Sequence, residues 1–138
     1  MSVRRIFALS RGMSLVELVV VLLIIAILGI VGLPSYRGYM ERAQRTEAKD
    51  ALLRLANNQE RFYLQNNTYT SNVTNLGFAT GGYTDDGSYT VSVTAADRQG
   101  FTARATIASS GGMVSDDECG WFQIDEAGDR TAESAICW

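Results

Sequence analysis

The sequence contains no histidine. This absence removes histidine-based catalytic triads, the usual general base near pH 7 and most catalytic zinc sites. The chain also shows no pairing of a nucleophile with a base, no metal-ligand spacing and no phosphate-binding loop. The composition therefore predicts a protein that is not an enzyme and holds no cofactor or metal. A membrane-anchored enzyme or binding module is the least favoured alternative.

Only two cysteines are present, Cys119 and Cys137. Two thiols in one short segment suit a single disulfide in an oxidising compartment, and two unrelated free thiols are the alternative. The apolar segment upstream, which we interpret below as a membrane segment, favours the disulfide. Closing a loop of this size would stabilise the fold by roughly 3 kcal/mol.

Polar side chains are missing from residues 18–33. Residues 13–17 extend this run and interrupt it only at Ser14 and Glu17. A helix over the whole block would be ~30 Å long, which is enough to span a bilayer. A chain of 138 residues has no core that could surround such a helix on all sides. The sequence therefore predicts a single membrane-spanning segment over residues 13–36.

The flanks of this block bear on processing and orientation. Residues 1–12 (MSVRRIFALSRG) carry three arginines and no acid. The block ends without the small-residue cleavage site of a secretory signal peptide, so we expect it to stay in the mature protein. Arginines lie on both sides, and charge alone leaves the orientation open. The cysteine pair favours a cytoplasmic N-terminus.

Glu17 places a carboxylate in the apolar run, at a cost on the order of 2.5–3.5 kcal/mol at mid-bilayer. By itself it indicates either a charged partner or a side chain that reaches the lipid headgroups. Residues 11–17 (RGMSLVE), followed by the apolar run and Pro34, resemble the prepilin signature of type IV pilins and related pseudopilins. The resemblance implies that a prepilin peptidase cuts between Gly12 and Met13 and methylates the new amine. The family most often has phenylalanine where this chain has Met13.

The resemblance also implies a role for Glu17 and a set of partners. In a filament, Glu17 of one subunit would neutralise the Met13 amine of its neighbour, and a slipped subunit would leave both charges unpaired. The implied partners are other pilin subunits in a homo- or heteropolymer, the peptidase, inner-membrane lipid, and an assembly platform with a cytoplasmic ATPase. The precursor would lie in the inner membrane, and the assembled protein in an extracellular pilus or the periplasm.

Gly29, Gly32 and Pro34 weaken the helix locally. Each glycine costs ~1 kcal/mol relative to alanine, and proline removes a backbone hydrogen bond. One interpretation is close helix packing in the membrane, where small residues are common. The other, which the resemblance implies, is a kink that melts and lets the filament stretch.

Beyond Pro34 the apolar residues keep helical spacing, and no glycine or proline interrupts residues 39–65. We predict one helix over residues 13–65 whose second half buries a face against a sheet. The buried face would hold Ala48, Ala51, Leu52, Leu55 and Phe62. Alternating acids and bases predict a solvated opposite face with Arg45, Glu47, Lys49, Asp50, Arg54, Glu60 and Arg61.

Three runs of alternating residues predict antiparallel strands at 88–95, 101–107 and 121–125, with turns at 97–100 and 126–129. The expected fold class is α+β, with three to four strands packed on the helix. The expected domains are a leader at 1–12, a filament-core helix at 13–36 and a head at 37–138. The segment bounded by Cys119 and Cys137 resembles the disulfide-bounded C-terminal loop of type IV pilins.

Residues 66–87 are rich in Asn, Thr, Gly and Asp, and we predict a long surface loop. Asp85, Asp86 and Gly87 indicate a turn, with a calcium site as the alternative. The acidic run Asp116, Asp117 and Glu118 is interpreted as a solvated turn, with a metal site as the alternative.

Residues 45–48, 59–63 and 67–70 are similar to the corresponding stretch of PilE-type minor pilins. The leading functional prediction is a structural pilus subunit for motility, adhesion or DNA uptake, and a type II secretion pseudopilin is the alternative. The cysteine pair and the lack of a clear calcium loop favour the pilus. Without residues 1–12 the side chains carry nine basic against fifteen acidic groups. This balance of −6 argues against nucleic-acid binding by a basic patch.

Overall fold

The computed structural model describes residues 13–109, 116 and 118–138, and for residues 31–35 the backbone alone. The chain divides into two compact units, with the boundary between Tyr36 and Arg37. The predicted leader, residues 1–12 with Gly12 at its end, lies outside the described residues, and so does Asp117.

Helix α1 runs from Leu15 to Asn66, which confirms the helix predicted over residues 13–65. In the first unit, every residue from 13 to 30 is exposed, and the apolar side chains among them range up to the 80% exposure of Leu15. Within the described residues, no helix combines the length and the apolar character that crossing a membrane requires. The membrane-spanning segment at 13–36 therefore stays a prediction.

In the second unit, α1 is amphipathic as predicted. Ala48, Ala51, Leu52 and Leu55 are buried, and Phe62 packs against the same core as a partly buried side chain. Residues spaced three and four apart share one face of a helix, so this face is a continuous apolar stripe.

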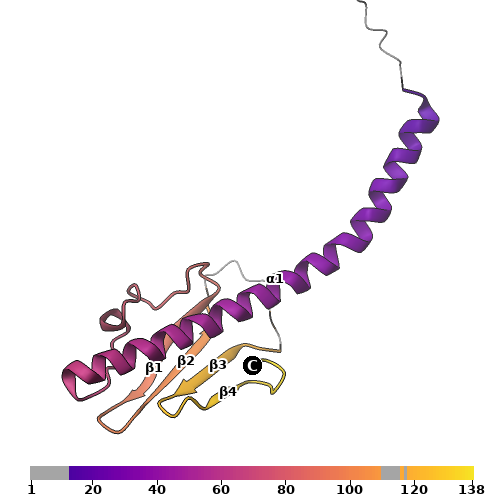
Figure 1. Cartoon of the computed structure of the whole chain (residues 1–138). Helices are drawn as coiled ribbons and strands as arrows, with labels where there is room; N and C mark the ends of the chain where they lie inside the picture. The colour runs from indigo at the N-terminus through magenta and orange to yellow at the C-terminus, as the bar shows by residue number, and fades with distance from the viewer. Residues whose placement is uncertain (1–12, 110–115, 117) are drawn as a thin grey trace, which may run out of the picture. The chain divides into compact units, whose positions relative to one another are not determined.

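That stripe covers a four-stranded antiparallel sheet in the order β1-β2-β3-β4 (Figure 1). The strands are β1 (Tyr89–Ala96), β2 (Phe101–Ile107), β3 (Trp121–Asp125) and β4 (Arg130–Ala132). The three predicted strands and the α+β class are confirmed. Strand β4, which pairs Ala132 with Phe122, extends the sheet beyond the predicted turn at 126–129.

One face of the sheet is apolar and the other is polar. Strand residues alternate between the two faces, and the inward positions are buried. They are Tyr89, Val91, Phe101, Ala103, Ala105, Phe122 and Ile124. The intervening positions carry Thr90, Arg104, Thr106, Trp121 and Gln123, with Arg104 stacked 4.5 Å from the ring centre of Trp121.

The prediction that residues 66–87 form a surface loop was wrong for their middle part. A short 3-10 helix, η1 (Val73–Leu76), begins after Asn72, whose Oδ1 accepts from the backbone N–H of Thr74 at 3.0 Å. It ends at Gly77, whose φ of 80° suits glycine. Leu76 and Phe78 are buried in the same core as Leu52 and Leu55. Two apolar side chains thus bring this segment onto the helix.

Gln59 fastens the start of the same segment to α1. Its Nε2 donates to the carbonyl of Thr70 at 2.7 Å, and its Oε1 accepts from the N–H of Thr70 at 3.1 Å. Gln59 is fully buried, so both ends of its amide are satisfied where water does not reach. The side chain of Gln59 therefore gives the backbone of Thr70 the two hydrogen bonds that a neighbouring strand could otherwise supply.

Candidate functional site

The residues predicted to guide assembly lie at the start of α1, with Met13 two residues before the helix begins and Glu17 in its first turn. Met13 and Glu17 are both exposed, and Glu17 stands in the first turn, where a carboxylate interacts favourably with the helix dipole. Apolar side chains around them are exposed through Ile30. Such a surface is typical of a segment that lipid or a protein partner covers.

The structure gives only part of the stretch from Gly29 to Pro34 that was predicted to weaken the helix. Gly29 is helical, and a Cβ placed on it would meet no atom within 4 Å. Gly32 and Pro34 have helical backbone. The kink and the close-packing interpretations both remain predictions.

The predicted disulfide between Cys119 and Cys137 is present. Both cysteines are buried, and the hydroxyl of Tyr89 donates to the carbonyl of Cys119 at 3.0 Å. Trp138 follows directly, with its ring edge-on to Phe122 and its Nε1 donating to the carbonyl of Thr131 at 2.6 Å. The disulfide thus joins the C-terminal segment to the start of β3.

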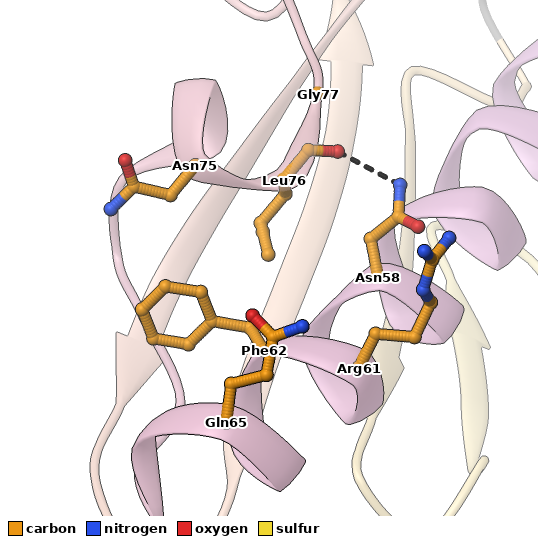
Figure 2. A pocket seen from close by; sticks show the side chains of 7 residues that line it. All are labelled: Asn58, Arg61, Phe62, Gln65, Asn75, Leu76 and Gly77. Carbon is orange, nitrogen blue, oxygen red and sulfur yellow. Dashed lines mark hydrogen bonds between the residues drawn. The ribbon is translucent and has the colours of Figure 1, made fainter.

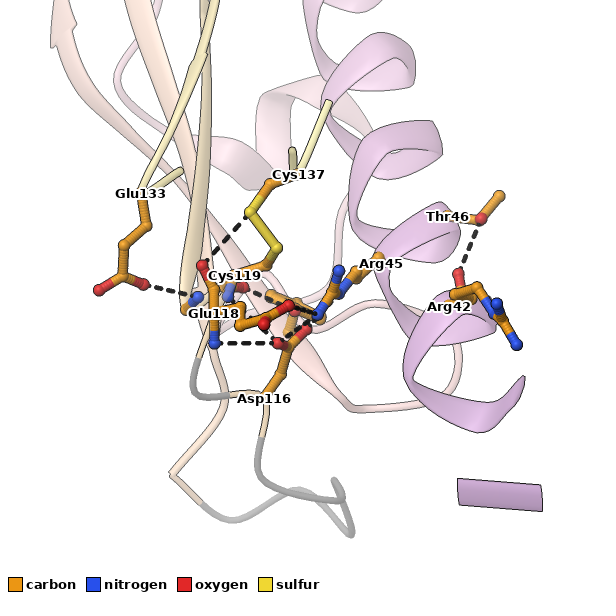
Figure 3. Close-up of polar contacts among 10 residues, drawn as sticks. Arg42, Arg45, Thr46, Asp116, Glu118, Cys119, Glu133 and Cys137 are labelled. Atoms are coloured by element: carbon orange, nitrogen blue, oxygen red, sulfur yellow. Dashed lines mark hydrogen bonds and ion pairs between the residues drawn. A yellow bond between two sulfur atoms is a disulfide. The ribbon is translucent and has the colours of Figure 1, made fainter. Parts of the chain in front are cut away.

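Arg45 and Asp116 form a largely buried ion pair. The predictions that Arg45 lies on a solvated helix face and Asp116 in a solvated turn were therefore wrong. Arg45 Nε donates to Asp116 Oδ2 at 2.6 Å, and Nη2 donates to Oδ1 at 2.7 Å (Figure 3). The side chain of Asp116 is 1% exposed and that of Arg45 17%. Glu118, the last residue of the acidic run, is exposed and lies 3.4 Å from Arg45 Nη2.

The carboxylate of Asp116 also accepts from the backbone N–H groups of Glu118 and Cys119. Burial by itself raises the pKa of this carboxyl, but the hydrogen bonds and charge of Arg45, together with the two N–H groups, hold the pKa below its usual value. Asp116 is therefore an ionised anchor that links α1 to the disulfide rather than a free metal ligand.

The turn predicted at Asp85, Asp86 and Gly87 is confirmed. Gly87 N–H donates to the carbonyl of Thr84 at 2.9 Å, and Asp86 Oδ1 accepts from the Thr84 hydroxyl and the Ser88 N–H. These bonds engage the Asp86 carboxylate within the turn itself. Among the residues that the structure describes, no group of three or more potential ligands could hold a metal.

A polar groove lies between α1 and η1, and sequence reasoning missed it (Figure 2). Its volume is about 320 Å³. One wall is a helical stripe and the other is the end of η1. The lining residues are Asn58, Arg61, Phe62, Gln65, Asn75, Leu76 and Gly77. The sequence shows that the four lining residues on α1 share one side of the helix. It does not show the opposing wall, because the position of that wall depends on where Leu76 packs.

Two of three comparisons with known proteins found a match. The sequence profile described as "Type IV minor pilin ComP, DNA uptake sequence receptor" matches residues 34–123. Among solved structures, a type IV pilin from Shewanella oneidensis is similar at 27% identity and a TM-score of 0.47. The similarity covers 70% of this chain and 94% of that chain. Among curated proteins, none matches the chain.

Proposed function

Since the chain belongs to the family of the type IV minor pilin ComP, the DNA uptake sequence receptor, we propose that it is built into a type IV pilus and receives DNA there. The observation that carries the proposal is the family match, which spans more than half of the chain. The family is one of structural subunits, which accords with the expectation that the chain is not an enzyme.

Assembly would run through the first unit. In this proposal the prepilin peptidase removes residues 1–12 after Gly12 and methylates Met13, and residues 13–36 pass from inner-membrane lipid into the filament core. The sequence of residues 11–17 and the exposed apolar side chains of residues 13–30 support it. Relative to exposure to water, burial of these side chains against neighbouring subunits would be favourable by about 25 cal/mol per Å² of apolar surface, which opposes the loss of assembled subunits into the surrounding water.

Glu17 would set the axial register of the subunits. Its carboxylate is exposed and makes no ion pair within the described residues. In a filament core of low dielectric constant, the amine of Met13 on a neighbouring copy would pair with it and offset the desolvation of both charges.

The other partners follow from the same proposal. They are further pilin subunits and an inner-membrane platform driven by a cytoplasmic ATPase. The precursor would keep its N-terminus in the cytoplasm, and residues 37–138 would form the head on the outside of the filament. The buried disulfide supports an oxidising location for this head.

DNA reception revises one sequence expectation. The side-chain charge of −6 without residues 1–12 argued against a basic patch, whereas the family description names a DNA receptor. The negative net charge and the DNA receptor of the family description conflict only in part. Net charge describes the whole chain, whereas DNA binding depends on the charge of a local surface. DNA contact on an acidic head would need a region from which the acids are absent.

The proposal is tested in the host by deleting the coding sequence and restoring it on a plasmid. We expect the deletion strain to lose most uptake of fluorescent duplex DNA, and the plasmid to restore it. Pili sheared from the restored strain should contain the chain. Unchanged uptake in the deletion strain would overturn the DNA role, and absence of the chain from sheared pili would overturn the filament role.

A further inference from the structure

Acidic residues are scarce in one continuous part of the head. Residues 51–84 contain a single acid, Glu60, and two bases, Arg54 and Arg61. Glu60 accepts a hydrogen bond from the Tyr69 hydroxyl at 3.0 Å, which occupies part of its carboxylate. On an otherwise acidic chain, this is a region where a polyanion would meet little repulsion.

The groove of Figure 2 lies within this region. Asn58, Arg61, Phe62 and Gln65 are spaced three, four and seven residues apart, so they share one side of α1. Figure 2 shows the Asn58 and Gln65 amides and the Arg61 guanidinium along this side, with the η1 segment opposite. The groove is therefore lined mainly by hydrogen-bonding groups.

Most of these groups are free to bind a ligand. The side chains of Arg61, Gln65 and Asn75 make no hydrogen bond to any residue that the structure describes. Asn58 donates from Nδ2 to the carbonyl of Leu76 at 2.8 Å, which leaves its Oδ1 as an acceptor. Guanidinium and amide groups are those that read base edges, since arginine pairs with guanine and asparagine or glutamine pairs with adenine.

The walls of the groove are held in place before any ligand arrives. Asn58 and Gln59 each bond the backbone of the opposing segment, at Leu76 and Thr70. Gly77 has no side chain, and a Cβ there would stand 4.0 Å from Asn58 Nδ2, at the edge of the groove. A preformed site loses less conformational entropy on binding than a flexible one.

We propose that this groove is the place where the chain contacts DNA, with Arg61 on a backbone phosphate and the amides of Asn58 and Gln65 on base edges. The inference rests on the proposed function, because it names the surface that a DNA receptor would use. Arg54, two turns from Arg61 on α1, is exposed but has the carboxylate of Asp85 at 3.5 Å, so among the described residues of this surface the positive charge without an acidic partner is that of Arg61.

The chain offers a matched pair of control residues. Arg98 and Gln99 lie in the turn between β1 and β2, are exposed, and have the same side chains as Arg61 and Gln65. The experiment measures mobility shifts of labelled host genomic fragments with the full chain in detergent micelles, at several salt concentrations. Variants are R61A, Q65A, R98A and Q99A, and each is checked for an unchanged melting temperature.

We expect R61A to lower affinity at least about fivefold and to reduce the slope of log K against log salt by about one, because one phosphate contact is lost. Q65A should lower affinity about fivefold without changing the slope, because it removes a base contact. R98A and Q99A should stay within about twofold of the unmodified chain, since no groove contact is lost.

Each contrary result has a distinct meaning. If the unmodified chain binds DNA and R61A and Q65A bind equally well, the groove assignment is overturned and the proposed function stands. If R98A weakens binding as much as R61A, only net charge matters, and the assignment is again overturned. If the unmodified chain does not shift DNA at any salt concentration, both the assignment and the DNA role fail.

Discussion

Arg45 and Asp116 are 71 positions apart in the sequence and form a two-pronged ion pair, with both donor–acceptor distances below 2.8 Å. Because Asp116 also accepts from the N–H of Cys119, this pair joins the middle of α1 to the disulfide. Two parallel hydrogen bonds fix orientation as well as distance, so the pair holds the segment before β3 against the helix.

Replacing Asp116 by asparagine should lower the free energy of unfolding by roughly 3 kcal/mol at pH 7, because it leaves a mostly buried guanidinium without its counter-charge. Urea unfolding monitored by circular dichroism measures this. The matched control is D85N, whose carboxylate is 78% exposed and lies 3.5 Å from Arg54. We expect the control to change stability by less than about 1 kcal/mol.

The same variant should alter the pH dependence of stability. The folded state holds the pKa of Asp116 below its usual value, so the unfolded state binds more protons in that range. The stabilisation is complete above the usual aspartate pKa of about 3.9 and is lost as pH falls through the folded pKa. The difference between the chain and D116N should therefore shrink below about pH 4. A constant difference from pH 7 to pH 2 would contradict this account.

Replacing both Cys119 and Cys137 by alanine should cost roughly 3 kcal/mol, because the disulfide closes a loop between residues 18 positions apart. Thiol reductant should destabilise the unmodified chain to a similar extent in urea titrations and leave the double variant unaffected. An unmodified chain that is equally stable with and without reductant, once reduction is verified by mass, would show that the disulfide contributes nothing.

Gln59 and Gln65 give a second matched comparison on the same helix. Q59A removes both hydrogen bonds to Thr70 and leaves partly buried backbone groups unpaired, so we expect a loss of about 2 kcal/mol. Q65A removes an exposed side chain and should change stability by less than about 0.5 kcal/mol. Thermal unfolding of the two variants measures the difference, and equal melting temperatures would refute the role assigned to Gln59.

The sequence predicted the elements well because their apolar periods are long and regular. Helix α1 and strands β1 to β3 were found close to their observed bounds, and the inward faces of Leu52, Leu55 and Tyr89 follow from their spacing. These features are local, since a period of 3.6 or of two residues appears within any window of ten.

The burial of Asp116, Gln59 and Leu76 and the groove were not predicted, because each depends on contacts between segments that are separated in the sequence. Nothing near Asp116 indicates that Arg45 will neutralise it, and the surrounding acids favour a solvated turn. The burial of Gln59 follows from its bonds to Thr70, and that of Leu76 from its packing against α1. The groove was missed for the same reason, because it requires η1 to lie beside Asn58 and Phe62.

The proposed register role of Glu17 is tested by E17V. We expect this variant to be inserted and cleaved, because both steps precede contact with a neighbouring subunit, and to be incorporated at least about tenfold less into filaments. Immunogold labelling of surface pili measures incorporation. The matched control is E126V, which changes an exposed glutamate of the head and should incorporate normally. Normal labelling of filaments carrying E17V would refute the role.

The most direct test of the whole account is the N-terminus of the protein recovered from sheared pili, determined by intact-mass and peptide mass spectrometry. The account predicts a chain that begins at Met13 with one methyl group on its amine and an oxidised cysteine pair. Filament-borne protein that still begins at residue 1 would contradict it.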